Sequence, residues 1–123
     1  MVAFEFLQWI FGKHQSIINK LMAREQSIDS DLAETEENWK NVHMMIESLM
    51  KIAKNIDRGN YGVTEKEKEE LYSQYERLLS QIKTRMQVLQ AENIRLKGSF
   101  KNQLNTVEEF EFFVAKRLRS RAA

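Results

Sequence analysis

The sequence predicts an all-α fold, and three observations support this prediction. Apolar residues recur in alternating steps of three and four over roughly seven heptads, which is the spacing of a packed helix. The chain has no proline, the residue that ends helices by removing a backbone donor. Only four glycines interrupt its 123 residues. We therefore expect one helical domain, residues 1–123, built as a long antiparallel two-helix coiled-coil hairpin.

The first predicted helix covers about residues 3–58. Its seam contains only three polar members, His14, Glu25 and Thr35, and reads Phe4, Leu7, Phe11, His14, Ile18, Leu21, Glu25, Ile28, Leu32, Thr35, Trp39, Val42, Ile46, Leu49, Ala53 and Ile56. Residues 27–31 are a candidate break, because Asp31 and Glu34 have the spacing of a capping box. The seam keeps its phase across this segment, which favours one continuous helix.

A turn is predicted at residues 59–63. Gly59, Asn60 and Gly62 are residues that accept positive φ at helix ends. Thr64 stands three residues before Glu67, the spacing of a capping box, so a second helix is expected to begin there.

The second predicted helix covers about residues 64–120. Its seam reads Leu71, Tyr75, Leu78, Ile82, Met86, Leu89, Asn93, Leu96, Phe100, Gln103, Val107, Phe110 and Val114. Gly98-Ser99 is a second candidate break. If the helices break at both 27–31 and 98–99, the chain forms a compact four-helix bundle, which is the alternative to the hairpin.

Apolar residues outside the seams predict an interface. Ile10, Ile17, Met45 and Ile52 lie on a second heptad line, and aromatic residues gather near both termini. A single hairpin would leave such residues exposed, and contiguous apolar surface usually marks a binding site. The residues expected to meet another copy or a partner protein are Phe4, Phe6, Trp9, Ile10, Ile17, Met45, Ile52, Phe110, Phe112 and Phe113. We expect a homo-oligomer, a dimer or higher, with a protein partner as the alternative.

No motif for catalysis, cofactor binding or metal binding is found. Cysteine is absent, and the two histidines, His14 and His43, lack the Glu-x-x-His spacing of metal sites in helical bundles. His14 is expected to be a core or register residue, and His43 to pair with Glu47 one turn away. We therefore expect no enzymatic activity and no cofactor.

The charge pattern disfavours nucleic acid and membranes as partners, because the net charge is only +1. The basic C-terminal residues Lys116, Arg117, Arg119 and Arg121 complement the helix dipole, and anion contact is their alternative role. No signal peptide or transmembrane segment is recognised, so a cytoplasmic location is the default expectation.

The expected function is that of a non-enzymatic structural or adaptor protein acting through helical packing and self-association. One alternative is a chaperone or export adaptor that binds a partner helix. Another is an architectural protein that associates with nucleic acid or membrane through its basic tail. The expected hairpin resembles, in shape alone, the stalk-like coiled-coil proteins of flagellar and type III export.

Overall fold

The fold of the chain is entirely helical in the part that can be described. The structure is a computed structural model that describes residues 2–24, 32–92, 98 and 100–122. Four helices make up most of these residues: α1 (Val2–Arg24), α2 (Leu32–Asp57), α3 (Glu65–Glu92) and α5 (Lys101–Ala122). No strand occurs in the described ranges. The predicted all-α fold class is therefore confirmed.

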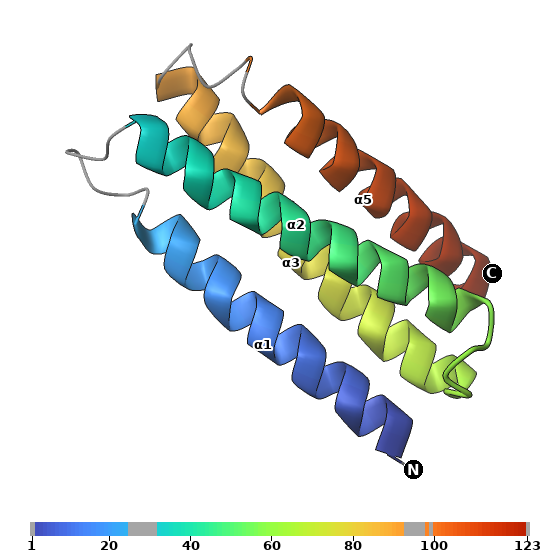
Figure 1. Cartoon of the computed structure of the whole chain (residues 1–123). Coiled ribbons are helices and arrows are strands. Elements are labelled where there is room, and N and C mark those ends of the chain that lie inside the picture. The colour runs from blue at the N-terminus through green and yellow to red at the C-terminus, as the bar shows by residue number, and fades with distance from the viewer. Residues whose placement is uncertain (1, 25–31, 93–97, 99, 123) are drawn as a thin grey trace.

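The four helices lie side by side in a compact, bundle-like arrangement (Figure 1). Helices α1 and α3 run in one direction, and α2 and α5 run in the other. Helix α2 packs between α1 and α5, and α3 packs against α5 and α1. The connection between α2 and α3 lies at the same end of the molecule as both termini. The predicted hairpin would place this turn at the end opposite to the termini.

The helices are shorter than the hairpin requires. A helix continuous over residues 3–58 would be about 84 Å long at 1.5 Å per residue. Helices α1 and α2 instead pack antiparallel on each other (Figure 1). The candidate break at 27–31 lies outside the described residues, and at 98–99 only Gly98 is described.

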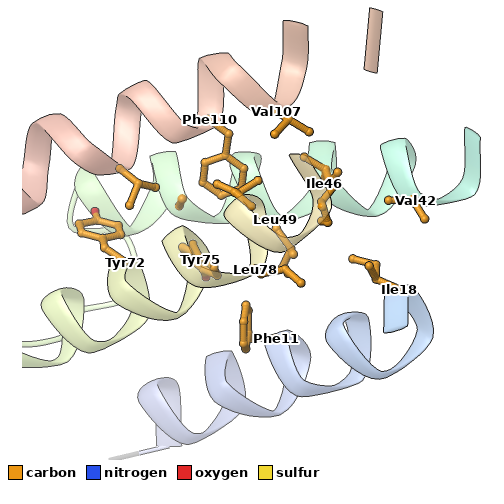
Figure 2. Close-up of a cluster of buried hydrophobic side chains, with 14 of the residues drawn as sticks. Phe11, Ile18, Val42, Ile46, Leu49, Tyr72, Tyr75, Leu78, Val107 and Phe110 are labelled. Carbon is orange, nitrogen blue, oxygen red and sulfur yellow. The ribbon is translucent and has the colours of Figure 1, made fainter. Parts of the chain in front are cut away.

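The seams read from the sequence form most of the core, which also includes Tyr72 and Leu79 from outside them. In α2, every seam residue from Thr35 to Ile56 is buried. Figure 2 shows that side chains from all four helices point into one common interior. The largest fully buried side chains are Trp39, Tyr72, Tyr75, Phe100, Phe110, Leu7, Ile18, Ile46, Leu49, Ile56, Leu71 and Leu78. The core therefore draws on every helix, and no helix is peripheral to it.

Aromatic contacts connect the helices within this core. The ring centroid of Tyr75 in α3 lies 5.4 Å from that of Phe11 in α1 and 5.6 Å from that of Phe110 in α5. Trp39 in α2 lies 5.4 Å from Phe100, the residue just before α5. Such pairs contribute about 0.5–1.5 kcal/mol each beyond the burial of their area.

The turn between α2 and α3 has the local structure expected from its residues. Gly59 and Gly62 adopt φ values of 83° and 64°, where a side chain would be strained. The backbone N–H of Thr64 donates to Oε1 of Glu67 at 2.8 Å, and that of Glu67 donates to Oγ1 of Thr64 at 3.1 Å. This reciprocal capping box begins α3.

Replacing Trp39 tests the core. Trp39 is 1% exposed, so Trp39→Ala is expected to lower the free energy of unfolding by about 3–5 kcal/mol through the cavity it leaves. Trp39→Phe should cost clearly less, because it keeps a ring and removes an indole N–H that has no hydrogen-bond partner in the described part of the chain. Urea denaturation measures both values. Equal losses would contradict this account of the packing.

The buried tyrosine predicts a loss of stability at alkaline pH. Burial, with smaller effects of Tyr72 and Tyr61, raises the pKa of the Tyr75 hydroxyl. Above about pH 10 the unfolded chain releases this proton while the folded protein retains it, so stability falls as the pH rises. Tyr75→Phe should weaken that fall, as measured by urea denaturation between about pH 9 and pH 11. Tyr61→Phe removes only the smallest of these effects on Tyr75, so it should leave most of the alkaline fall in place. An unchanged alkaline fall in Tyr75→Phe would refute the prediction.

Candidate interaction surface

Helix α1 carries large apolar side chains on its outward side as well as in the core. The exposed large hydrophobic residues of the described chain are Phe6 (50%), Trp9 (59%), Ile17 (40%), Met44 (61%), Val88 (40%) and Phe112 (67%). The first three belong to α1. Its inward side is formed by Leu7, Phe11 and Ile18, all buried. Core packing therefore leaves Phe6, Trp9 and Ile17 of α1 exposed.

The outward apolar residues of α1 contact one another. The rings of Phe6 and Trp9 stack with centroids 6.2 Å apart. Nζ of Lys13 lies 4.8 Å from the centroid of Trp9, a cation–π contact. Ile17 follows Lys13 by four residues, and residues three or four apart share one face of a helix. We call the line of Phe6, Trp9, Lys13 and Ile17 the α1 outer stripe.

The α1 outer stripe leads into a groove between α1 and α2. This hollow has a volume of about 370 Å³ and is lined by Ile17, Leu21, Asn41, Met44, Met45 and Ser48. We call it the α1/α2 groove. Ile17 and Met45 lay on the predicted second heptad line, and the antiparallel packing of α1 on α2 brings them to the same hollow. The groove is open to solvent, since Ile17, Met44 and Ser48 are exposed.

The ten residues predicted to form an interface have different surroundings in the structure. Four are exposed: Phe6, Trp9, Ile17 and Phe112. Five are half-buried: Phe4, Ile10, Met45, Ile52 and Phe113.

Phe110 is the exception, because it is 1% exposed and its ring contacts Tyr75 inside the core of the same chain. It is therefore not accessible to a partner. The sequence pattern contained a signal for this, because Phe110 also belongs to the seam of the second predicted helix, and seam residues are expected to be buried.

The basic residues near the C-terminus are not equivalent. Nη2 of Arg117 donates to Oδ2 of Asp57 at 3.0 Å, and its Nε lies 2.9 Å from Oδ1. The guanidinium lies 3.4 Å from the ring centroid of Phe113, whose carbonyl accepts from Nη1 at 3.1 Å. Arg117 therefore ties the end of α5 to the end of α2, and this role was not predicted. Lys116 and Arg119 are exposed, and the side chain of Arg121 lies outside the described ones.

A second hollow, of about 430 Å³, lies between α2 and α5. Its lining residues are Glu36, Lys40, His43, Phe100, Asn102 and Gln103. Thr106 donates its hydroxyl hydrogen to the carbonyl of Asn102 at 3.1 Å, so the 2.9 Å contact of His43 Nε2 with Thr106 Oγ1 has the imidazole as donor. Oε1 of Glu47 lies 3.3 Å from the same Nε2. In a catalytic relay, the acid orients the imidazole through the other ring nitrogen, which is not the arrangement here.

The other histidine has a structural contact. Nδ1 of His14 donates to the carbonyl of Ile10 at 2.9 Å, and the side chain is half-buried. Among the described residues, no three His, Asp or Glu side chains lie close enough to hold a metal ion. Within the same residues, no helix combines the length and the apolar character needed to cross a membrane.

Sequence reasoning missed part of the α1/α2 groove. Leu21, Asn41, Met44 and Ser48 were not among the predicted interface residues. The sequence did contain a signal for them. One antiparallel register places Ile10 opposite Ile52 and also Ile17 opposite Met45. A turn centred near residue 31 would have placed these pairs opposite each other.

Comparison with known proteins gives no relative: no family model, no curated protein and no solved structure matches this chain. The function must therefore be argued from the geometry described above.

The Arg117 contacts predict a stabilising role for this residue. Arg117→Ala is expected to lower the free energy of unfolding by about 1–2 kcal/mol, because it removes a partly exposed ion pair and a ring contact. Arg119→Ala is the matched control on an exposed turn of the same helix, with an expected change within about 0.5 kcal/mol. Thermal or urea denaturation measures both. If the two variants were equally stable, Arg117 would not tie α5 to α2.

Proposed function

We propose that this protein is a non-enzymatic structural or adaptor protein that acts by packing an apolar helix surface against other helices. One observation carries the proposal. The α1 outer stripe and the α1/α2 groove together present large apolar side chains that the core of the chain does not cover. Contiguous exposed apolar surface of this kind marks interaction sites in folded proteins.

The form of the surface supports helix packing as the binding mode. The α1/α2 groove runs between two antiparallel helices, and such a groove accepts the apolar face of a third helix. Two of its lining residues, Met44 and Met45, have flexible and polarisable side chains that adapt to the shape of a partner. A groove of this kind needs no deep pocket for its ligand.

The non-enzymatic part of the proposal rests on the side-chain geometry. The only contact between a histidine, an acid and a hydroxyl in the described chain directs Glu47 and Thr106 to one nitrogen of His43. The Thr106 hydroxyl is itself engaged with a backbone carbonyl. This arrangement supports a structural role for the three residues.

Self-association is a second candidate, and the position of Phe112 favours it. Phe112 is 67% exposed on α5, which lies on the other side of the molecule from α1 (Figure 1). Apolar side chains on two sides would allow copies of the chain to pack together. We further propose that each copy is a compact four-helix bundle in solution.

Solution mass and shape test these proposals together. The longest helix, α3, has 28 residues and would span about 42 Å, against about 80 Å for an unbroken hairpin. Light scattering after size exclusion, coupled to small-angle X-ray scattering, should show compact particles. A mass of 14.6 kDa at all concentrations supports an adaptor, and a larger mass that rises with concentration supports self-association. An 80 Å rod would contradict the bundle.

The double variant Trp9→Ser with Ile17→Ser provides the control. Both residues are exposed, so its melting temperature should stay close to that of the wild type. Any self-association through this surface should weaken. If the double variant lost as much stability as Trp39→Ala, the stripe would belong to the core and the proposed function would fail.

A further inference from the structure

We propose that the α1/α2 groove binds an amphipathic helix of another protein, whose apolar stripe is flanked by acidic residues. The inference rests on the proposed function and names the partner class for its surface. It is carried by the length of the apolar surface, by the charges around it and by the poor fit of a second copy.

The apolar surface has the length of a short helix. Phe6, Ile10, Ile17 and Leu21 recur at helical spacing along α1, and Lys13 fills the gap in this line. From Phe6 to Leu21 the helix rises about 22 Å, which corresponds to about four turns of a bound helix. The Phe6–Trp9 stack closes one end of this surface, and the methionines of α2 line the other. A partner helix of that length could bury its apolar face along the whole line.

The charges beside the groove are mainly positive. Lys13 and Lys20 lie four residues before and three residues after Ile17, and Lys51 lies three residues after Ser48. All three lysines are exposed, and among the described residues none has a carboxylate within 4.0 Å. A bound helix with acidic residues beside its apolar stripe would therefore place its carboxylates next to unpaired ammonium groups.

Other charges within one turn of the groove do not reverse this balance. Lys40 lies four residues before Met44, but it lines the hollow between α2 and α5 and therefore adds no charge to the groove. Of the two nearby acids, Glu37 is exposed at the end of the groove, and Glu47 faces His43 at 3.3 Å on the side of α2 toward α5. Three exposed lysines thus lie beside the groove against one exposed acid, Glu37, while Glu47 and Lys51 share a neighbouring hollow on α2.

A second copy of the chain fits this surface poorly. In a two-fold dimer through the α1/α2 groove, the same patch of each copy would face its equivalent. Lys13, Lys20 and Lys51 of one copy would then lie close to the same lysines of the other. Like charges across an interface weaken association, and opposite charges select the partner. The charge pattern therefore favours a different, acidic helix.

Designed peptides test the proposal with the full-length protein. The probe is a fluorescently labelled peptide of about 18 residues, which has leucines at helical spacing with glutamates on both sides. A second peptide has lysines in place of the glutamates. We expect the acidic peptide to bind at least about tenfold more tightly in fluorescence anisotropy, and its affinity to fall as salt increases.

Two charge-matched variants locate the site. Lys13→Glu with Lys20→Glu should remove the preference for the acidic peptide or reverse it. Lys66→Glu with Lys101→Glu changes the net charge by the same amount at exposed positions on α3 and α5, and it should retain the preference. Because all four lysines are exposed, both double variants should melt close to the wild-type temperature.

Several results would overturn the inference. Equal affinity for both peptides, or binding of neither, would show that the groove does not select acidic helices. An equal loss in the two double variants would show an effect of net charge only.

Dimerisation abolished by Ile17→Asp with Met44→Asp would identify a second copy as the occupant. Binding of phosphatidylserine vesicles that depends on Lys13 and Lys20, without peptide binding, would identify a lipid surface. None of the peptide results decides the proposed function, which the Trp9–Ile17 double variant tests separately.

Discussion

The contacts of one ring hold three helices together. Tyr75 of α3 lies against Phe11 of α1 and Phe110 of α5, and all three rings are buried. Figure 2 shows Phe11 reaching toward Tyr75 and Leu78 from α1. Helix α1 packs on both α2 and α3, and the contact of Phe11 with Tyr75 fixes its position on the α3 side.

The large apolar residues of α1 include a buried group and an exposed group. Leu7, Phe11 and Ile18 are buried and contribute to folding, since full burial of such a side chain is worth about 1.5–3 kcal/mol. Phe6 and Trp9 remain exposed to water, although burial of their rings would stabilise the fold by a similar amount. In the proposed interaction, this exposed apolar area would drive association, and the neighbouring lysines would add selectivity for an acidic partner.

At the end of the molecule that carries both termini, polar contacts hold the helices together. Arg117 pairs with Asp57 and lies over Phe113, whose ring meets the edge of Tyr72 at a centroid distance of 6.4 Å. The capping box at Thr64 starts α3 at the same end. These contacts hold the last turn of α5 against the end of α2, so that a basic residue near the C-terminus has a structural partner and is not free for an anion.

The sequence by itself determined the local structure and most of the core, although Tyr72 and Leu79 are buried outside the predicted seams. The capping box and the glycine turn follow from residues three or four apart, so no distant contact is needed to form them. The seam of α2 from Thr35 to Ile56 is buried as its period indicated. Only the tertiary structure decided which helix covers each seam. Helical periodicity shows which side of a helix faces inward, and that side is the same whether the chain continues straight or turns back. For this reason the seams of α1 and α2 read as one helix, and the α1/α2 groove became visible only once Ile17 and Met45 were placed side by side.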